Sequence, residues 1–311
     1  MVEVKNLSRQ FGTFTAVDNI SFQVQQGEVL GFLGPNGAGK STSMKMITGF
    51  LAPSAGTAII NGFDIINKPL QAKREIGYLP EGAPAYPDMT VVDFLEFIAE
   101  IRNFSGTEKS KRVDSVIERV SLESVRYQLI DTLSKGFKRR VGLAQAILHD
   151  PKVLIMDEPT DGLDPNQKHE VRSLIQDMAQ EKVIILSTHI LEEVHAVCSR
   201  AIIIANGRLI ADDTPAALEA RAPNHNAVTL TLPAEQQNAA SIRESLQGIA
   251  HIKELKVLEE NDDWFSYLLL PKRDQSIVNQ VSQIAHQQQW TIKELSVARG
   301  QLDEVFRQLT V

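Results

Sequence analysis

The chain has 311 residues, of which 43% are hydrophobic and 23% charged, a balance typical of a globular protein with one large and one small domain. The net charge is −7 and no Lys/Arg run is longer than Lys138-Arg139-Arg140, which excludes the basic footprint of a nucleic-acid-binding protein; no nucleic-acid partner is expected. The single cysteine, Cys198, cannot form an intrachain disulfide and is expected to be a small buried apolar residue.

The N-terminal part of the chain is predicted to be rich in β-structure. Strands are expected at residues 2–7, 20–24 and 57–60. The apolar residues 29–33 are typical of a buried strand. Further on, Met44, Ile47 and Leu51 recur at helical spacing, so a helix is expected to pack one face on the sheet.

Between this strand and this helix lies a segment that fits the phosphate-loop pattern G-x-x-x-x-G-K-[ST]. Its residues are Gly34, Pro35, Asn36, Gly37, Ala38, Gly39, Lys40 and Ser41, followed by Thr42 at the start of the helix. The glycines let backbone N–H groups turn inward around phosphate oxygens, and the helix N-terminus adds a positive dipole. Lys40 is expected to reach the β- and γ-phosphates and Ser41 to bind Mg²⁺. The predicted ligand is a nucleoside triphosphate, because a glycine-rich turn before an ordinary helix would not require this spacing.

Residues 88–150 are predicted to be a helical subdomain. Within them, the side chains of Val91, Phe94, Leu95, Ile98 and Ile101 form one apolar stripe at helical spacing.

A second motif follows the apolar residues 153–156, which predict a buried parallel strand. Asp157 and Glu158 stand at its C-terminal end, where ligands collect in open α/β sheets. Asp157 is placed to hold Mg²⁺, and Glu158 is the candidate to polarise a water against the γ-phosphate. The alternative is a solvated turn, but the apolar run and the upstream phosphate loop favour catalysis.

The core is expected to resume with strands at residues 183–187 and 201–205. The first of them leads to His189, whose imidazole can hydrogen-bond the γ-phosphate and help to hold Glu158 and the water.

Residues 221–311 are predicted to be a separate C-terminal domain, after a first domain of residues 1–220. Its predicted element order, βαββαβ, suggests a ferredoxin-like α+β module. It contains no phosphate loop and no metal cluster, so dimerisation or docking is favoured over a ligand-sensing role.

Over roughly its first 215 residues, the chain resembles the nucleotide-binding subunits of the ATP-binding cassette (ABC) family. The phosphate loop and the segment ending in Asp157 and Glu158 carry this resemblance, which implies ATP as the nucleotide. It also implies a P-loop NTPase fold with a mixed core sheet, an antiparallel β subdomain and a helical subdomain. The segment Arg9-Gln10-Phe11-Gly12 is similar to the family's aromatic loop, so Phe11 is expected to stack on adenine, with Val17 beside the nucleotide. A lone aromatic such as Phe11 is more often a core residue, but the downstream Ala16-Val17 and the spacing to the phosphate loop favour the stacking role.

The segment Leu133-Ser134-Lys135-Gly136-Phe137 is similar to the family signature, usually written L-S-G-G-Q. Ser134 can cap the following helix, and Ser134 and Gly136 are expected to bind the phosphate of ATP held by an opposite protomer. Lys135 replaces a glycine; it either adds positive charge near the γ-phosphate or points to solvent. Asp161-Gly162-Leu163-Asp164 resembles the loop through which protomers touch, with Asp164 counted among the nucleotide contacts.

Residues 76–81 align with the loop in which most cassettes carry Gln, whereas this chain has Glu81. A carboxylate can still coordinate Mg²⁺, but it adds negative charge beside ATP. The resemblance thus implies Glu158, His189 and Lys40 as catalytic residues, and Ser41, Glu81 and Asp157 as metal ligands.

The implied function is that of the ATP-hydrolysing subunit of an ABC exporter. Such a subunit acts as a homodimer with two ATP molecules at its interface and powers a separate integral membrane permease. No apolar run in the chain could span a bilayer, so it is expected to lie peripherally on the cytoplasmic face of the membrane, through that permease. Two alternatives stay open: a soluble cassette ATPase acting on ribosomes or nucleic acid, and a regulatory ATP binder with blunted catalysis.

Overall fold

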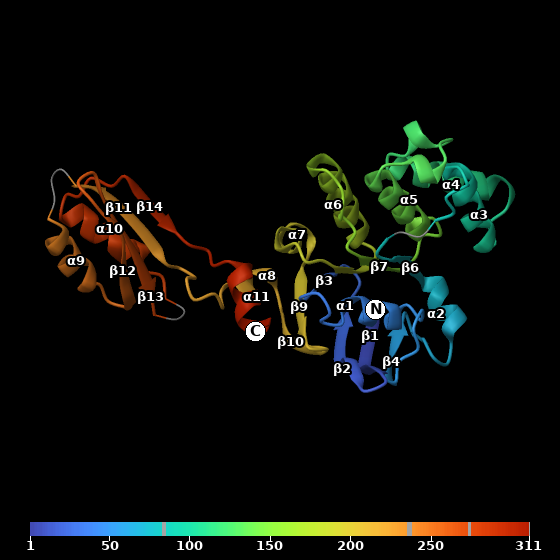
Figure 1. The fold of residues 1–311 in the computed structure, drawn as a ribbon, viewed down its shortest axis with the longest axis horizontal. Helices are drawn as coiled ribbons and strands as arrows, with labels where there is room; N and C mark the ends of the chain where they lie inside the picture. The colour runs from blue at the N-terminus through green and yellow to red at the C-terminus, as the bar shows by residue number, and fades with distance from the viewer. Residues whose placement is uncertain (83–84, 235–237, 273–274, 311) are drawn as a thin grey trace. The chain divides into compact units, whose positions relative to one another are not determined.

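The computed structural model describes residues 1–82, 85–234, 238–272 and 275–310. The chain divides into two compact units, Met1–Pro215 and Ala216–Leu309, each of which is described by itself (Figure 1). In the described parts of the chain, no helix combines the length and the apolar character needed to cross a membrane.

An antiparallel sheet with the strand order β2-β1-β4-β5 forms one layer of the first unit. Its strands are β1 (Val2–Phe11), β2 (Phe14–Val24), β4 (Ala55–Ile60) and β5 (Phe63–Asp64). β1 and β2 are longer than the predicted strands and form a hairpin, in which Phe11 pairs with Phe14 at the tip. Phe11 therefore ends a strand instead of lying in a separate loop.

A mixed sheet with the order β10-β9-β3-β8-β7-β6 forms the second layer. Its strands are β3 (Val29–Leu33), β6 (Ile76–Leu79), β7 (Val153–Asp157), β8 (Val183–Ser187), β9 (Arg200–Ala205) and β10 (Arg208–Asp213). All neighbouring pairs are parallel except β9 and β10, so the carboxyl ends of β3, β6, β7 and β8 lie at one edge. Residues 76–81 are the segment that the family resemblance assigned to a loop; of these, 76–79 form β6, and Pro80 and Glu81 lie beyond its end.

Helix α1 (Lys40–Ile47) shares one apolar core with both sheets. Met44 and Ile47 are fully buried in this core, as predicted. The prediction that Leu51 belongs to the same helix is wrong, because the helix ends at Ile47 and Gly49 takes a positive φ of 66°. Leu51 packs on the core from the segment that follows.

The helices of the first unit flank these sheets, with α3 to α5 gathered together (Figure 1). They are α2 (Pro69–Glu75), α3 (Val91–Ile101), α4 (Gly106–Arg119), α5 (Lys135–Ile147), α6 (Pro165–Ala179) and α7 (Leu191–Val197), with short 3₁₀ turns at Glu123–Val125 and Ile130–Thr132. The stripe predicted in α3 is only partly buried: Val91, Phe94 and Leu95 are in the core, whereas Ile101 is 59% exposed.

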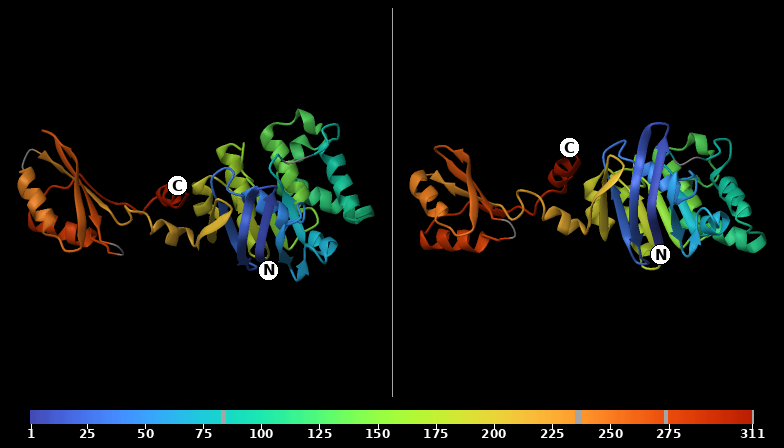
Figure 2. Two further views of the ribbon diagram at one scale, coloured as in Figure 1. Left: turned by 60° about the horizontal axis from the view of Figure 1, so that its bottom comes forward. Right: turned by 90° about the horizontal axis from the view of Figure 1, so that it is seen from below.

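The second unit contains a four-stranded antiparallel sheet of order β12-β13-β11-β14. Its elements are α8 (Pro215–Glu219, which begins at the end of the first unit), β11 (Val228–Pro233), α9 (Ala239–Gln247), β12 (Ile252–Glu260), β13 (Trp264–Pro271), α10 (Val278–Gln287), β14 (Glu294–Val297) and α11 (Leu302–Thr310). α9 and α10 cover one face of the sheet (Figures 1 and 2), where Leu230, Ile242 and Val281 share a core. The predicted ferredoxin-like fold is confirmed by this order and this layering.

A half-buried histidine ties the end of α5 to the core sheet. A ring nitrogen of His149 lies 3.0 Å from the carbonyl oxygen of Ile76 at the start of β6. Burial lowers the pKa of His149 to about 4, with a further lowering by Arg102 and opposing effects of the Ile76 carbonyl and Asp150. The side chain therefore stays neutral in the folded protein at pH values where a solvated imidazole is protonated.

This depressed pKa predicts a pH-dependent stability. Between about pH 6.5 and pH 4, His149 is protonated in the unfolded chain but stays neutral in the folded chain. The free energy of unfolding therefore decreases as the pH falls through this window. The single group contributes a slope of up to about 1.4 kcal/mol per pH unit. Urea unfolding at pH 7, 6 and 5 measures the slope, and His149→Gln is expected to flatten it. An equal slope in the variant would assign the effect to other groups.

Candidate functional site

The predicted phosphate loop leaves β3 and enters α1 at the edge where the parallel strands end. Gly37 and Gly39 have φ values of 80° and 107°, which favour glycine. Gly34 approaches the sheet closely, because a Cβ built on it would lie 2.4 Å from the carbonyl oxygen of Ile204. Glycine is thus required here for two separate reasons, a left-handed backbone and a close packing distance.

Lys40 lies inside this loop, with only 7% of its surface exposed. Its Nζ donates to the carbonyl oxygens of Gly34 at 2.6 Å and Pro35 at 3.1 Å. Burial lowers the pKa of Lys40, whereas the carboxylates of Glu158, Asp157 and Glu81 act in the opposite direction. A cation held by loop carbonyls and faced by three carboxylates is positioned for a phosphate that enters the loop.

Asp157 is the last residue of β7 and is 1% exposed. Its Oδ1 accepts a hydrogen bond from Ser187 Oγ at the end of β8. Its Oδ2 is buried and has no hydrogen-bond partner among the described residues. A buried carboxylate oxygen without a partner is costly, so this atom marks a position for a ligand.

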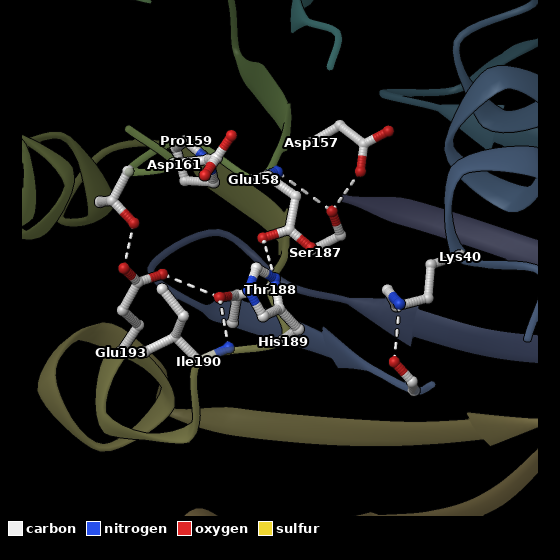
Figure 3. A network of polar contacts seen from close by, with 12 residues as sticks. Lys40, Asp157, Glu158, Pro159, Asp161, Ser187, Thr188, His189, Ile190 and Glu193 are labelled. Atoms are coloured by element: carbon white, nitrogen blue, oxygen red, sulfur yellow. Dashed lines mark hydrogen bonds and ion pairs between the residues drawn. The ribbon is translucent and has the colours of Figure 1, made fainter. Parts of the chain in front are cut away.

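Glu158 turns away from the strand, with a φ of 53°. Its backbone N–H donates to the carbonyl oxygen of Ser187 at 3.1 Å and to Ser187 Oγ at 3.2 Å. Its Oε2 lies 2.8 Å from Nδ1 of His189; Figure 3 shows this contact and the bond to Ser187 Oγ. Burial raises the pKa of Glu158, against the lowering effects of His189 and Lys40. The carboxylate and imidazole predicted to act together are therefore in direct contact.

Behind this pair lies a buried network that the sequence reasoning missed (Figure 3). Glu193 of α7, 2% exposed, accepts hydrogen bonds from Thr188 Oγ1 at 2.8 Å and from Thr160 Oγ1. Thr188 Oγ1 in turn accepts from the N–H of Ile190 at 3.0 Å. The network fixes the backbone on both sides of His189. In the sequence, a glutamate pair opening a short helix gives no sign of such a role.

A hollow of about 460 Å³ joins half of the predicted nucleotide contacts. It is lined by Phe11, Phe14, Ala16, Asn36, Gly37, Gly39, Lys40, Ser41, Thr42, Glu81 and Glu158. Phe14, 61% exposed, was not singled out from the sequence, although it pairs with Phe11 across the hairpin tip. Val17 does not line the hollow: it is fully buried in the core, and its Cγ2 would lie 3.2 Å from a Cβ built on Gly39.

The signature residues lie outside this hollow, at the N-terminus of α5. Ser134 caps this helix, as predicted, with its Oγ accepting from the N–H of Phe137 at 3.3 Å. Asp164 caps α6 in the same way, accepting from Gln167 N at 2.9 Å. Gly136 is buried against Gln167, whose Oε1 would lie 2.6 Å from an added Cβ.

Lys135 points to solvent, which is one of its two predicted arrangements, and it also forms an ion pair that was not predicted. Its side chain is 70% exposed, yet its Nζ forms an ion pair of 2.7 Å with Asp161 Oδ2 in the same chain. The hydrogen bond from Lys135 lowers the pKa of Asp161.

A second hollow, of about 890 Å³, lies beside β6 and is lined by residues of α2, β6 and α3. Its lining includes the exposed apolar side chains Phe50, Leu70 and Ile101, which are 76%, 72% and 59% exposed. Lys73, Arg74 and Arg102 also line it. Two buried polar atoms at this hollow, the hydroxyl of Tyr78 and Nδ1 of His149, have no hydrogen-bond partner among the described residues.

Comparison with known proteins agrees with this geometry. The family model described as "ABC transporter" matches residues 17–161. The Nod factor export ATP-binding protein I of Paraburkholderia xenovorans is 40% identical over 221 residues, which are 70% of this chain and 72% of that protein. The chain belongs to the ABC transporter ATP-binding family. The prediction of the family, of the cassette fold and of an ATP-binding ATPase is thereby confirmed.

A solved structure and a second relative are also similar to this chain. A solved structure of an ATP-binding subunit of an ABC transporter superposes with a TM-score of 0.65 at 32% identity, over 70% of this chain and 92% of that one. The probable multidrug ABC transporter ATP-binding protein YbhF of Escherichia coli is 36% identical over 72% of this chain, but the match spans only 39% of YbhF.

Replacing Glu158 with Gln tests its predicted role as the base. The amide keeps the size of the side chain but cannot accept the proton of an attacking water, so ATP turnover is expected to fall about 10²- to 10⁴-fold. The dissociation constant for ATP is expected to stay within about twofold, because the phosphate loop is untouched. Phosphate release and calorimetric ATP binding measure the two quantities. Glu192→Gln, at an exposed position on α7, is the matched control, and parental turnover in Glu158→Gln would remove Glu158 from this role.

Proposed function

We propose that this chain is the ATP-hydrolysing subunit of an ABC exporter whose membrane permease is a separate chain. The observation that carries the proposal is the convergence of Lys40, Asp157, Glu158 and His189 at one edge of the core sheet. The relatives named for Nod factor export and for multidrug transport support the export direction.

The proposed chemistry assigns one task to each group. The loop N–H groups and Lys40 hold the phosphates, Glu158 accepts the proton of the attacking water, and His189 fixes the orientation of Glu158 through the 2.8 Å contact. Mg²⁺ would be held by Ser41, Asp157 and Glu81 and would neutralise charge on the phosphates. The buried, unpartnered Oδ2 of Asp157 fits such a cation.

We further infer that the chain works as a homodimer. Ser134 is exposed at the N-terminus of α5, outside the hollow that contains the phosphate loop of its own chain. A helix N-terminus with a hydroxyl cap is suited to bind phosphate. A second copy of the chain would supply that phosphate as part of its own ATP.

The proposed permease contact is the hollow beside β6. Its exposed apolar side chains and three cationic residues are complementary to a short permease helix with an apolar face and a carboxylate. Since β6 leads directly to Glu81, a partner seated there would sense the nucleotide. This contact would hold the chain at the cytoplasmic face of the membrane.

Co-purification tests the exporter proposal. A tagged Glu158→Gln chain, trapped with ATP, is expected to bring down a polytopic permease in comparable amount when membranes are extracted in mild detergent with Mg-ATP. Mass spectrometry identifies the partner. Recovery of the tagged chain alone, or of ribosomal or nucleic-acid-binding proteins, would overturn the proposal in favour of a soluble cassette ATPase.

Charged substitutions in the hollow beside β6 test the proposed permease contact separately. Leu70→Glu and Ile101→Glu are expected to reduce permease recovery at least about tenfold, because each buries a carboxylate in an apolar contact. ATP hydrolysis by the isolated chain should be unchanged, since neither residue lines the nucleotide hollow. Leu258→Glu, at an exposed leucine of the second unit, is the control. Full recovery with both variants would move the contact elsewhere.

A further inference from the structure

Two cations of the signature helix α5 point to the same short segment, residues 157–161, that carries the catalytic carboxylate. Lys135 and Arg139 stand four residues apart, so they share one face of the helix. Arg139 hydrogen-bonds the segment at its beginning, and Lys135 forms an ion pair with Asp161 at its end.

Among the described residues, the hydrogen bonds of Arg139 all go to backbone carbonyls, and these belong to two separate segments. Its Nη2 donates to the carbonyl oxygen of Glu158 at 2.7 Å and to that of Asp157, and its Nε to that of Pro159 at 3.4 Å. Its Nη1 donates to the carbonyl oxygen of Pro80 at 2.7 Å, directly before Glu81. A planar guanidinium offers five donors in a fixed fork, so it can hold several carbonyls in a defined geometry where lysine cannot.

The surroundings of Arg139 make this contact rigid. The side chain is 6% exposed, and burial lowers its pKa, an effect that Asp157 and Asp161 oppose. A buried guanidinium must keep its hydrogen bonds, because the loss of one leaves a desolvated charge without a partner. A displacement of α5 must therefore either break these hydrogen bonds or displace residues 157–161 together with the helix.

Lys135 adds a second, weaker contact on the surface. Its ion pair with Asp161 is solvent-exposed on both sides, and such pairs contribute little to stability. The aliphatic part of Lys135 crosses Gly162, where an added Cβ would lie 2.5 Å from Lys135 Cδ. Lys135, a departure from the usual signature, thus secures the far end of the same segment.

We propose that Arg139, assisted by Lys135, is a positioning residue that couples the signature helix to Glu158 and to the loop of Glu81. The inference rests on the proposed function as an ATPase subunit. A displacement of α5, as when its N-terminus engages ATP on a second copy, is transmitted through Arg139 to the backbone of Glu158. The nucleotide-binding residues of the phosphate loop are not part of this connection.

Steady-state ATP hydrolysis by the full chain tests this coupling. Arg139→Gln is expected to lower kcat about 10- to 100-fold, the cost of a misplaced catalytic group, with KM for ATP within about twofold. Arg139→Lys, which keeps the charge but not the fork, should give an intermediate kcat. The matched control is Arg140→Gln: Arg140 is equally buried, but it bonds Glu170 and the carbonyl of Val120, away from the catalytic segment. Arg140→Gln should lower the melting temperature similarly and leave kcat within about twofold.

The outcomes separate this inference from the proposed function. If the parent chain hydrolyses no ATP alone or with its permease, the proposed function fails. If the parent is active and folded Arg139→Gln retains more than half of its kcat, or Arg140→Gln loses as much as Arg139→Gln, the coupling fails.

If Arg139→Gln does not fold, a double-mutant cycle on the exposed ion pair of Lys135 and Asp161 tests the inference instead. Lys135→Ala, Asp161→Ala and the double variant should each lower kcat about two- to fivefold to the same level. Additive losses, or no loss at all, would overturn the inference.

Discussion

The site depends on the parallel pairing of β7 with β8 and of β8 with β3, which brings three distant segments of the chain to one edge of a sheet. Every residue of these strands is buried, so apolar packing fixes their register. Asp157 faces Ser187, and the phosphate loop begins beside them, because the strands end together. The charged groups of the site are therefore placed by residues that take no part in the chemistry.

Burial makes these charges dependent on their partners. Lys40, Arg139 and Asp157 each expose 7% of their surface or less, and an isolated ion in such a place would be costly. Lys40 and Arg139 are satisfied by backbone carbonyls of loops that the site has to keep in place. Asp157 keeps one oxygen without a partner among the described residues. The same hydrogen bonds thus compensate the buried charges and fix the loops.

Predictions from the sequence held best where a pattern is local. The alternation of Val228, Leu230 and Leu232 matches a strand with one buried face, and the cap at Ser134 needs only its own helix. The predictions failed where contacts with other parts of the fold determine the end of a helix or the burial of a side chain. Leu51 continues a helical period past the glycine that ends the helix, and Ile101 continues the stripe of α3 into an exposed hollow.

The sequence by itself determined the phosphate loop, the strand that ends in Asp157 and Glu158, and the family, because each is written in consecutive residues with a fixed spacing. Only the tertiary structure decided the partners of Arg139, Glu193 and Lys135. Each of these side chains binds groups that are distant in the chain, and their residue types are common on solvated helix faces. The folded backbone alone brings them together, since burial and hydrogen-bond partners are properties of three-dimensional packing.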